Sequence, residues 1–150
     1  MLKNSFIHYL TKVLIDIMFY VGIIGCILAP FITKRAAEYF GYSSNLVLPT
    51  TIVLITSGIS ALYILWQLKM IFRTLINNNP FVYQNVVYLR KMSVASFIIA
   101  IIYTVKFTFW FTIATAIIAI IFMIAGLFCL TLKDVFKQAV LYKEENDLTV

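Results

Sequence analysis

Few residues in this chain of 150 could carry out chemistry. The only histidine is His8, which lies far along the sequence from the second cysteine, Cys129, and in a different segment from the first, Cys26. A nucleophile needs a base within hydrogen-bonding reach, and a structural zinc ion needs about four thiolate or imidazole ligands. The sequence offers neither set. We therefore predict no catalytic, cofactor-binding or metal-binding residues, and we expect a protein that is not an enzyme.

Asp16 is the one acidic residue inside a long apolar segment, and a charge at such a position suggests a function by default. It lies four residues after Lys12, so an ion pair on one helix face near the membrane interface accounts for it, as does contact with headgroup water. A proton or cation site is the alternative. We expect a structural or interfacial role, because no second acid occurs at a comparable depth.

The composition identifies the class of protein. Hydrophobic residues make up 63% of the chain and the mean hydropathy is +0.98, outside the range of soluble globular proteins. The pattern predicts an all-α integral membrane four-helix bundle, with membrane lipids as partners and spans at about 12–33, 46–68, 93–106 and 112–132. Lys and Arg that flank the spans explain the net charge of +6, so we expect no direct binding of nucleic acid.

The predicted connections are short. Pro30 lies near the end of the first span, where a helix break does little harm, and residues 33–45 are expected to form the first connection. Residues 106–111 (KFTFWF) are expected to form an aromatic turn at the headgroups. Cys26 and Cys129 differ in predicted depth by on the order of 15 Å, so we expect them to be unpaired packing residues.

The distribution of basic residues orients the chain. With the N-terminus inside, nine basic residues lie on the cytoplasmic side, namely Lys3, Lys12, Lys69, Arg73, Arg90, Lys91, Lys133, Lys137 and Lys143. Three lie outside, namely Lys34, Arg35 and Lys106. This split predicts a multi-pass protein of the cell membrane, with both termini and residues 69–92 and 133–150 in the cytoplasm.

The polar interval from Asn77 to Met92 is predicted to begin a helix. Asn79 is a favourable N-cap and Pro80 fits the first helical position. Neither Gly nor Pro follows before Lys106, so we expect one unbroken helix of about 26 residues. Its first turns have an apolar face and a wet face, and the residues predicted to be wet are Gln84, Asn85, Tyr88 and Lys91.

The second and fourth helices are expected to continue past the lipid, toward Ile76 and to about Glu144. Apolar stripes beyond the lipid must be buried, either on one another in a short cytoplasmic bundle or in a partner protein. Within the second span, small residues at four-residue spacing predict close helix packing, and they are Thr56, Ser57, Gly58, Ser60 and Ala61.

Residues 79–92 (NPFVYQNVVYLRKM) and 135–150 (VFKQAVLYKEENDLTV) resemble a bacterial family of four-span membrane proteins catalogued as domain of unknown function 2975. The resemblance covers essentially the whole chain. Its most specific residues are Pro80, Phe81, Asn85, Leu89, Arg90, Glu145, Asn146, Asp147, Leu148 and Thr149. Members are typically encoded beside a small helix-turn-helix regulator, which implies that the membrane protein controls it. The resemblance supplies no catalytic or ligand residue, and many members have Gly where this chain has its Asn run.

We therefore expect the cytoplasmic segments to bind and restrain such a regulator, with the apolar stripes receiving a helix and the acidic end facing its basic surface. The residues predicted to contact this partner are Phe81, Asn85, Leu89, Arg90, Phe136, Val140, Glu144, Glu145 and Asp147. The alternatives are an immunity or resistance protein against a membrane-active peptide and a small transporter subunit. A second copy of the chain is a further candidate partner.

Overall fold

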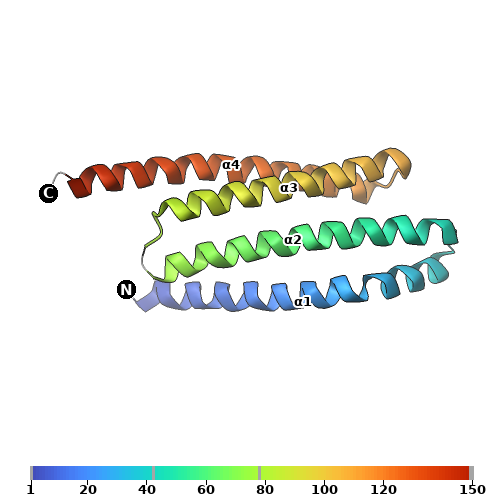
Figure 1. Cartoon of the computed structure of the whole chain (residues 1–150). Helices are drawn as coiled ribbons and strands as arrows, with labels where there is room; N and C mark the ends of the chain where they lie inside the picture. The colour runs from blue at the N-terminus through green and yellow to red at the C-terminus, as the bar shows by residue number, and fades with distance from the viewer. Residues whose placement is uncertain (1, 42, 78, 149–150) are drawn as a thin grey trace.

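The computed structural model of the chain describes residues 2–41, 43–77 and 79–148, except for the side chains of residues 2–6 and 147. Its helices are α1 (Leu2–Phe40), α2 (Val47–Ile76), α3 (Tyr83–Phe109) and α4 (Ile113–Leu148), with a short 3-10 turn, η1 (Ser44–Leu46), before α2 (Figure 1). All four helices are long and apolar enough to cross a membrane. The predicted fold class, an all-α protein with four spans, is confirmed.

The helices pack in chain order, each antiparallel to the one before. α1 packs along α2, α2 along α3, and α3 along α4, and the last pair has the largest contact. In the described part of the chain, α1 makes no extensive contact with α3 or α4. The start of α1, the α2–α3 connection and the end of α4 lie at one end, which we call the N–C end, and the other two connections lie at the loop end (Figure 1).

α3 is the most buried helix, because it lies between α2 and α4. Near the N–C end, Leu89 and Met92 of α3 form a cluster with Ile71 of α2 and Cys129 of α4. The outer faces of the helices expose Ile, Leu, Val and Phe side chains along most of their length. A bilayer, rather than protein, is the environment that suits those faces.

Small residues allow α1 and α2 to approach closely. A Cβ atom on Gly22 would lie 2.8 Å from Cδ2 of Leu62, and one on Gly58 would lie 2.6 Å from Sγ of Cys26. The hydroxyls of Thr33 and Thr51 also hydrogen-bond across the pair at 2.6 Å. The predicted packing by small residues of the second span is thus confirmed at Gly58, whereas Thr56 is exposed and bonds only to its own helix.

The first connection is shorter than predicted. α1 continues through Pro30 to Phe40, so residues 33–40 are helical. Proline removes one backbone hydrogen bond, and helices in membranes tolerate this because side chains and neighbouring helices compensate. The helix ends at Phe40, and the next residue, Gly41, has a φ of 68°, the left-handed conformation that glycine adopts after a helix.

Candidate functional site

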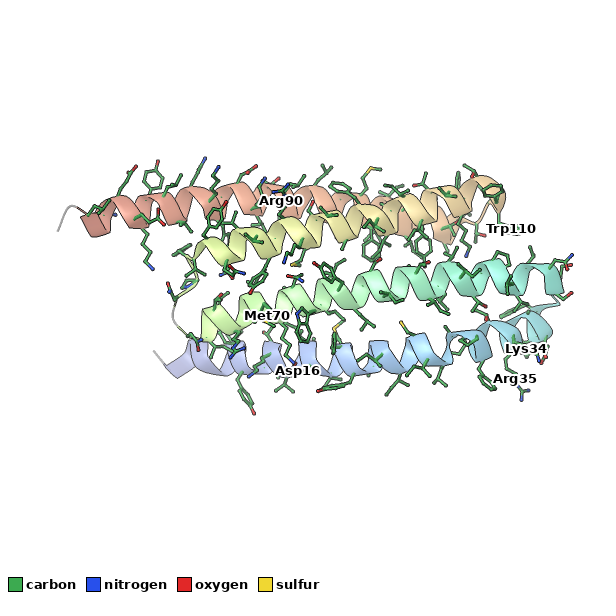
Figure 2. The ribbon with its side chains drawn as sticks, in the orientation of Figure 1. Asp16, Lys34, Arg35, Met70, Arg90 and Trp110 are labelled. Atoms are coloured by element: carbon green, nitrogen blue, oxygen red, sulfur yellow. The ribbon has the colours of Figure 1, made fainter. Side chains whose placement is uncertain are left out.

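Charged side chains from all four helices lie at one level of the structure. Asp16 of α1 pairs with Lys69 of α2, Arg90 and Lys91 lie on α3, and Lys133 follows the core cluster on α4. We call these five residues the charged belt. Figure 2 shows Asp16, Met70 and Arg90 at similar positions along the long axis of the molecule.

The stretch between the belt and the loop end has the length of a bilayer core. Asp16 and Lys34 are separated by about 27 Å along α1 at 1.5 Å per residue, against a hydrocarbon thickness of about 30 Å. Figure 2 shows Lys34, Arg35 and Trp110 near the loop end. Charges therefore bracket the apolar part of the molecule on both sides.

All four helices continue past the charged belt toward the N–C end, α1 with its residues 2–15 (Figure 1). We call residues 72–88 and 134–148 the overhang. It contains the end of α2, the α2–α3 connection, the first turns of α3 and the last turns of α4. α4 extends furthest (Figure 1). The overhang corresponds closely to the two segments in which the sequence predicts a partner-binding surface.

The overhang is organised around Asn85, whose side chain is 0% exposed. Its Nδ2 donates hydrogen bonds to Oγ1 of Thr74 and to the backbone carbonyl of Pro80, both at 2.7 Å. The prediction that Asn85 belongs to the wet face is therefore wrong. The carboxamide is buried because it joins α2, the connection and α3, whose polar groups would otherwise lack partners.

The start of α3 also differs from the prediction. Val82 is the N-cap and Tyr83 the first helical residue, so Pro80 lies in the connection. The Pro80 carbonyl bonds to Asn85 instead of starting a helix, and Oδ1 of Asn79 accepts a hydrogen bond from Nζ of Lys143 at 2.8 Å. From Tyr83 the helix is unbroken to Phe109, which confirms the predicted continuity through the third span.

The last turns of α4 pack on the α2–α3 connection. The rings of Phe81 and Phe136 lie 6.0 Å apart between centroids, and Val140 is buried. The Lys143–Asn79 hydrogen bond lies one turn further along α4. Part of the apolar stripe of α4 is thus buried within the chain itself, as the short-bundle alternative requires.

Another part of the overhang's apolar surface stays uncovered. Phe81 is 45% exposed despite its contact with Phe136. Other large apolar side chains are also exposed there, and they are Ile76, Tyr83, Val135, Leu141, Tyr142 and Leu148. Soluble surfaces rarely expose so many large apolar groups close together unless they bind something. The overhang therefore offers an apolar surface to a ligand or partner.

The nine residues predicted to contact a partner separate into three groups. Asn85, Leu89 and Val140 are buried, so they hold the overhang together and present no surface to a partner. Phe81, Arg90, Glu144 and Glu145 are exposed and Phe136 is half-buried, so a partner can reach them. The side chain of Asp147 lies outside the described residues.

Asp16 is paired with a residue that the sequence analysis did not select. Its Oδ1 lies 2.7 Å from Nζ of Lys69 on α2, and both side chains are about one-third exposed, at 30% and 32%. Lys12, the predicted partner, is exposed, and no Lys12–Asp16 pair is present in the described structure. A pair between two helices is favoured because each charge then partly neutralises the other beside apolar surroundings.

Polar side chains line the α2–α3 interface, and the sequence analysis did not single them out. Gln67 and Ser93 are 4% and 0% exposed, and neither Oε1 of Gln67 nor Oγ of Ser93 has a hydrogen-bond partner in the described part of the chain. The Thr74–Asn85 hydrogen bond fixes an antiparallel register that brings both residues to one level. Gln67 could have indicated this interface from the sequence, because it is an amide inside an apolar run.

The cysteines and acids do not form a reactive cluster in the described residues. Cys26 and Cys129 are free thiols, as predicted, one against Gly58 and the other in the core cluster. Among the residues whose positions are given, three or more His, Cys, Asp or Glu side chains nowhere gather as metal ligands would.

Comparison with known proteins places the chain in one family. The family model described as "Protein of unknown function (DUF2975)" matches residues 31–150. The match begins inside α1 and includes the complete overhang, whereas the sequence resemblance was expected to cover essentially the whole chain. Neither the curated proteins nor the solved structures contain a match.

Proposed function

The chain belongs to the DUF2975 family, whose function is unknown, and we propose that it binds and restrains a small helix-turn-helix transcription regulator through the overhang at the cytoplasmic face of the cell membrane. One observation carries this proposal, namely the large apolar side chains that the overhang leaves exposed beyond the charged belt. Such side chains would lie in water, since the belt marks the end of the apolar spans. An amphipathic helix of a partner would cover them.

Charge supports the same kind of partner. Glu144 and Glu145 lie exposed on the last turns of α4, next to the exposed Leu141 and Tyr142. A helix-turn-helix protein has a basic surface that contacts DNA phosphates. An acidic segment beside an apolar anchor would compete with DNA for that surface. The family resemblance in the overhang points to a regulator of this class.

The two parts of the surface have different expected contributions. Apolar anchors at the centre of an interface cost about 2 kcal/mol or more when truncated, whereas exposed acids mainly change the association rate and its salt dependence. Leu141 and Tyr142 are the best positions to alter, because they are exposed and lie beyond the core cluster. Phe81 is less suitable, since its loss also removes the internal contact with Phe136.

The test compares Leu141→Ala/Tyr142→Ala with a control, Leu127→Ala/Phe128→Ala, whose residues are exposed on the same helix in the apolar span. The family resemblance implies a helix-turn-helix protein encoded beside this chain, and we expect that protein to co-purify with the wild type and the control and to be lost from the overhang variant. Transcription of the regulator's target genes should differ from the wild-type level only in cells that carry the overhang variant. Unchanged transcription on deletion of the whole chain, with the regulator present and active, would contradict the proposal.

The alternative functions predict other results. An immunity or resistance protein would change the sensitivity of cells to a membrane-active peptide, and it would use the loop end, where residues 110–112 form a short connection. A transporter subunit would depend on Asp16, whose charge is paired with Lys69. Peptide sensitivity or solute uptake that changes on deletion, with no effect on transcription, would favour these alternatives.

A further inference from the structure

A groove of about 530 Å³ lies between α2 and α3 and extends from Val87, one turn before the charged belt, past the belt toward the loop end. Ile59 and Tyr63 line it from α2, and Val94 and Ile98 line it from α3. These four side chains are between 44% and 58% exposed, so the groove opens sideways from the helix pair. Its volume lies within the range of about 300–1,000 Å³ that small-molecule sites occupy.

Two cations stand at one end of this groove. Arg90 and Lys91 line it, and both side chains are exposed. Other basic residues of the belt have acidic neighbours, since Lys69 pairs with Asp16 and Lys133 with Asp134. Within the described residues, neither Arg90 nor Lys91 forms an ion pair. The groove therefore has a positive end whose charge is not neutralised by the protein.

The apolar part of the groove extends from the cations into the membrane-spanning region. Arg90 and Ile98 are separated by about 12 Å along α3 at helical rise. Since the belt marks one edge of the apolar spans, this stretch faces acyl chains. A soluble macromolecule cannot reach it there. A free phosphate ion could meet the cations but would leave the apolar stretch uncovered.

We propose that this groove is a binding site for one anionic phospholipid, whose phosphate contacts Arg90 and Lys91 and whose acyl chain lies along Val94 and Ile98. Basic side chains at a membrane surface contribute about 1 kcal/mol each toward anionic lipid, so two cations favour it over a zwitterionic lipid by more than tenfold. Arg90 then serves the lipid site, although the sequence suggested a regulator contact. The inference does not depend on the proposed function, because Val87 alone of the groove's lining residues belongs to the overhang.

The experiment titrates the full-length chain in neutral detergent with phosphatidylglycerol or phosphatidylcholine of the same acyl chains, and native mass spectrometry counts bound lipid. We expect one phosphatidylglycerol to bind at least about tenfold more tightly than phosphatidylcholine. Arg90→Gln/Lys91→Gln should abolish this preference. The control Lys34→Gln/Arg35→Gln removes the same charge from exposed positions near the loop end and should change the affinity by less than about twofold.

A second variant tests the apolar stretch separately from the charge. Val94→Trp fills the groove and keeps both cations, and it should also weaken phosphatidylglycerol binding, with helix content by circular dichroism as the check on folding. Equal losses in the two charge variants, equal affinity for the two lipids, unaltered binding to the Val94→Trp protein, or displacement of the lipid by inorganic phosphate would each overturn the proposal.

Discussion

Asn85 shows how much one polar side chain contributes at the N–C end. Its amide satisfies the hydroxyl of Thr74 and the carbonyl of Pro80, so it joins the end of α2 to the connection that leads into α3. Ser93, two turns further along α3, is equally buried, yet its hydroxyl has no partner in the described structure. Two buried polar residues on one helix thus have opposite expected effects on stability.

We expect Asn85→Ala to lower the free energy of unfolding by about 1–3 kcal/mol, because it leaves buried polar groups without partners. Ser93→Ala should leave that free energy unchanged or raise it, since the variant removes an unpaired hydroxyl from a buried site. Unfolding in mixed micelles, followed by circular dichroism, measures both. A loss of stability for Ser93→Ala as large as that for Asn85→Ala would show that the hydroxyl of Ser93 does have a partner.

The ion pair of Asp16 is also testable at the level of single residues. A double-mutant cycle of Asp16→Asn and Lys69→Gln should give a coupling free energy of about 1 kcal/mol, because both side chains are partly exposed. The same cycle with Lys12→Gln is the control and should give a coupling near zero. Coupling to Lys12 instead of Lys69 would restore the pairing that the sequence suggested. Because the carboxylate is already paired, Asp16→Asn should also leave the cellular phenotype intact.

Among the elements, the α1–α2 pair depends on glycine more than the other pairs do. Gly22 and Gly58 both lie against side chains of the facing helix, at distances that leave no room for a Cβ atom. At Gly25, three residues further along α1, a Cβ atom would meet no neighbouring atom within 4 Å. In α4, Gly126 similarly faces the ring of Phe97 of α3. Some glycines in these helices therefore permit close helix packing, whereas Gly25 does not.

Gly58→Ala is expected to destabilise the protein by about 1–3 kcal/mol, since the new methyl group would lie 2.6 Å from Sγ of Cys26, so that the thiol must rotate or the helices must separate. Gly25→Ala is the matched control and should be neutral or stabilising by up to about 1 kcal/mol, because alanine favours the helix and meets no neighbour. Thermal unfolding in detergent distinguishes the two. A stable Gly58→Ala variant would mean that the Cys26 thiol or α1 itself can move away from α2 without cost.

At the scale of the whole molecule, the two ends differ in the length of helix that passes the charged residues. At the loop end the connections are short, and the helices stop close to Lys34, Arg35 and Lys106. At the N–C end all four helices pass the charged belt and expose large apolar side chains. A soluble partner protein would therefore have more surface to bind at the N–C end.

The side of the membrane on which that surface lies is predicted by the basic residues. In a cysteine-free background (Cys26→Ala/Cys129→Ala), Ser44→Cys should react with a membrane-impermeant maleimide in intact cells. Glu144→Cys should react only after the cells are permeabilised. The reverse pattern would place the overhang outside the cell, where it could not meet a transcription regulator.

The amino-acid sequence by itself determined the class of protein, the number of helices long and apolar enough to span a membrane, and the continuation of the second helix to Ile76 and of the fourth to Glu144 and beyond. These follow from the length and periodicity of apolar segments, which are properties of each segment alone. The course of the chain at Pro30 was less predictable, since the cost of a proline depends on whether neighbouring helices satisfy the backbone.

Only the tertiary structure decided which polar groups meet. Lys69, rather than Lys12, pairs with Asp16 because α2 lies against α1 in a register that brings the two charges to one level. Asn85 is buried, although its spacing suggested a wet face. The end of α2 covers it, and the hydroxyl of Thr74 accepts a hydrogen bond from its side-chain amide. The groove at Arg90 and Lys91 likewise exists only between two paired helices. Helical periodicity specifies the faces of one helix, whereas the partner of each face depends on how the helices pack.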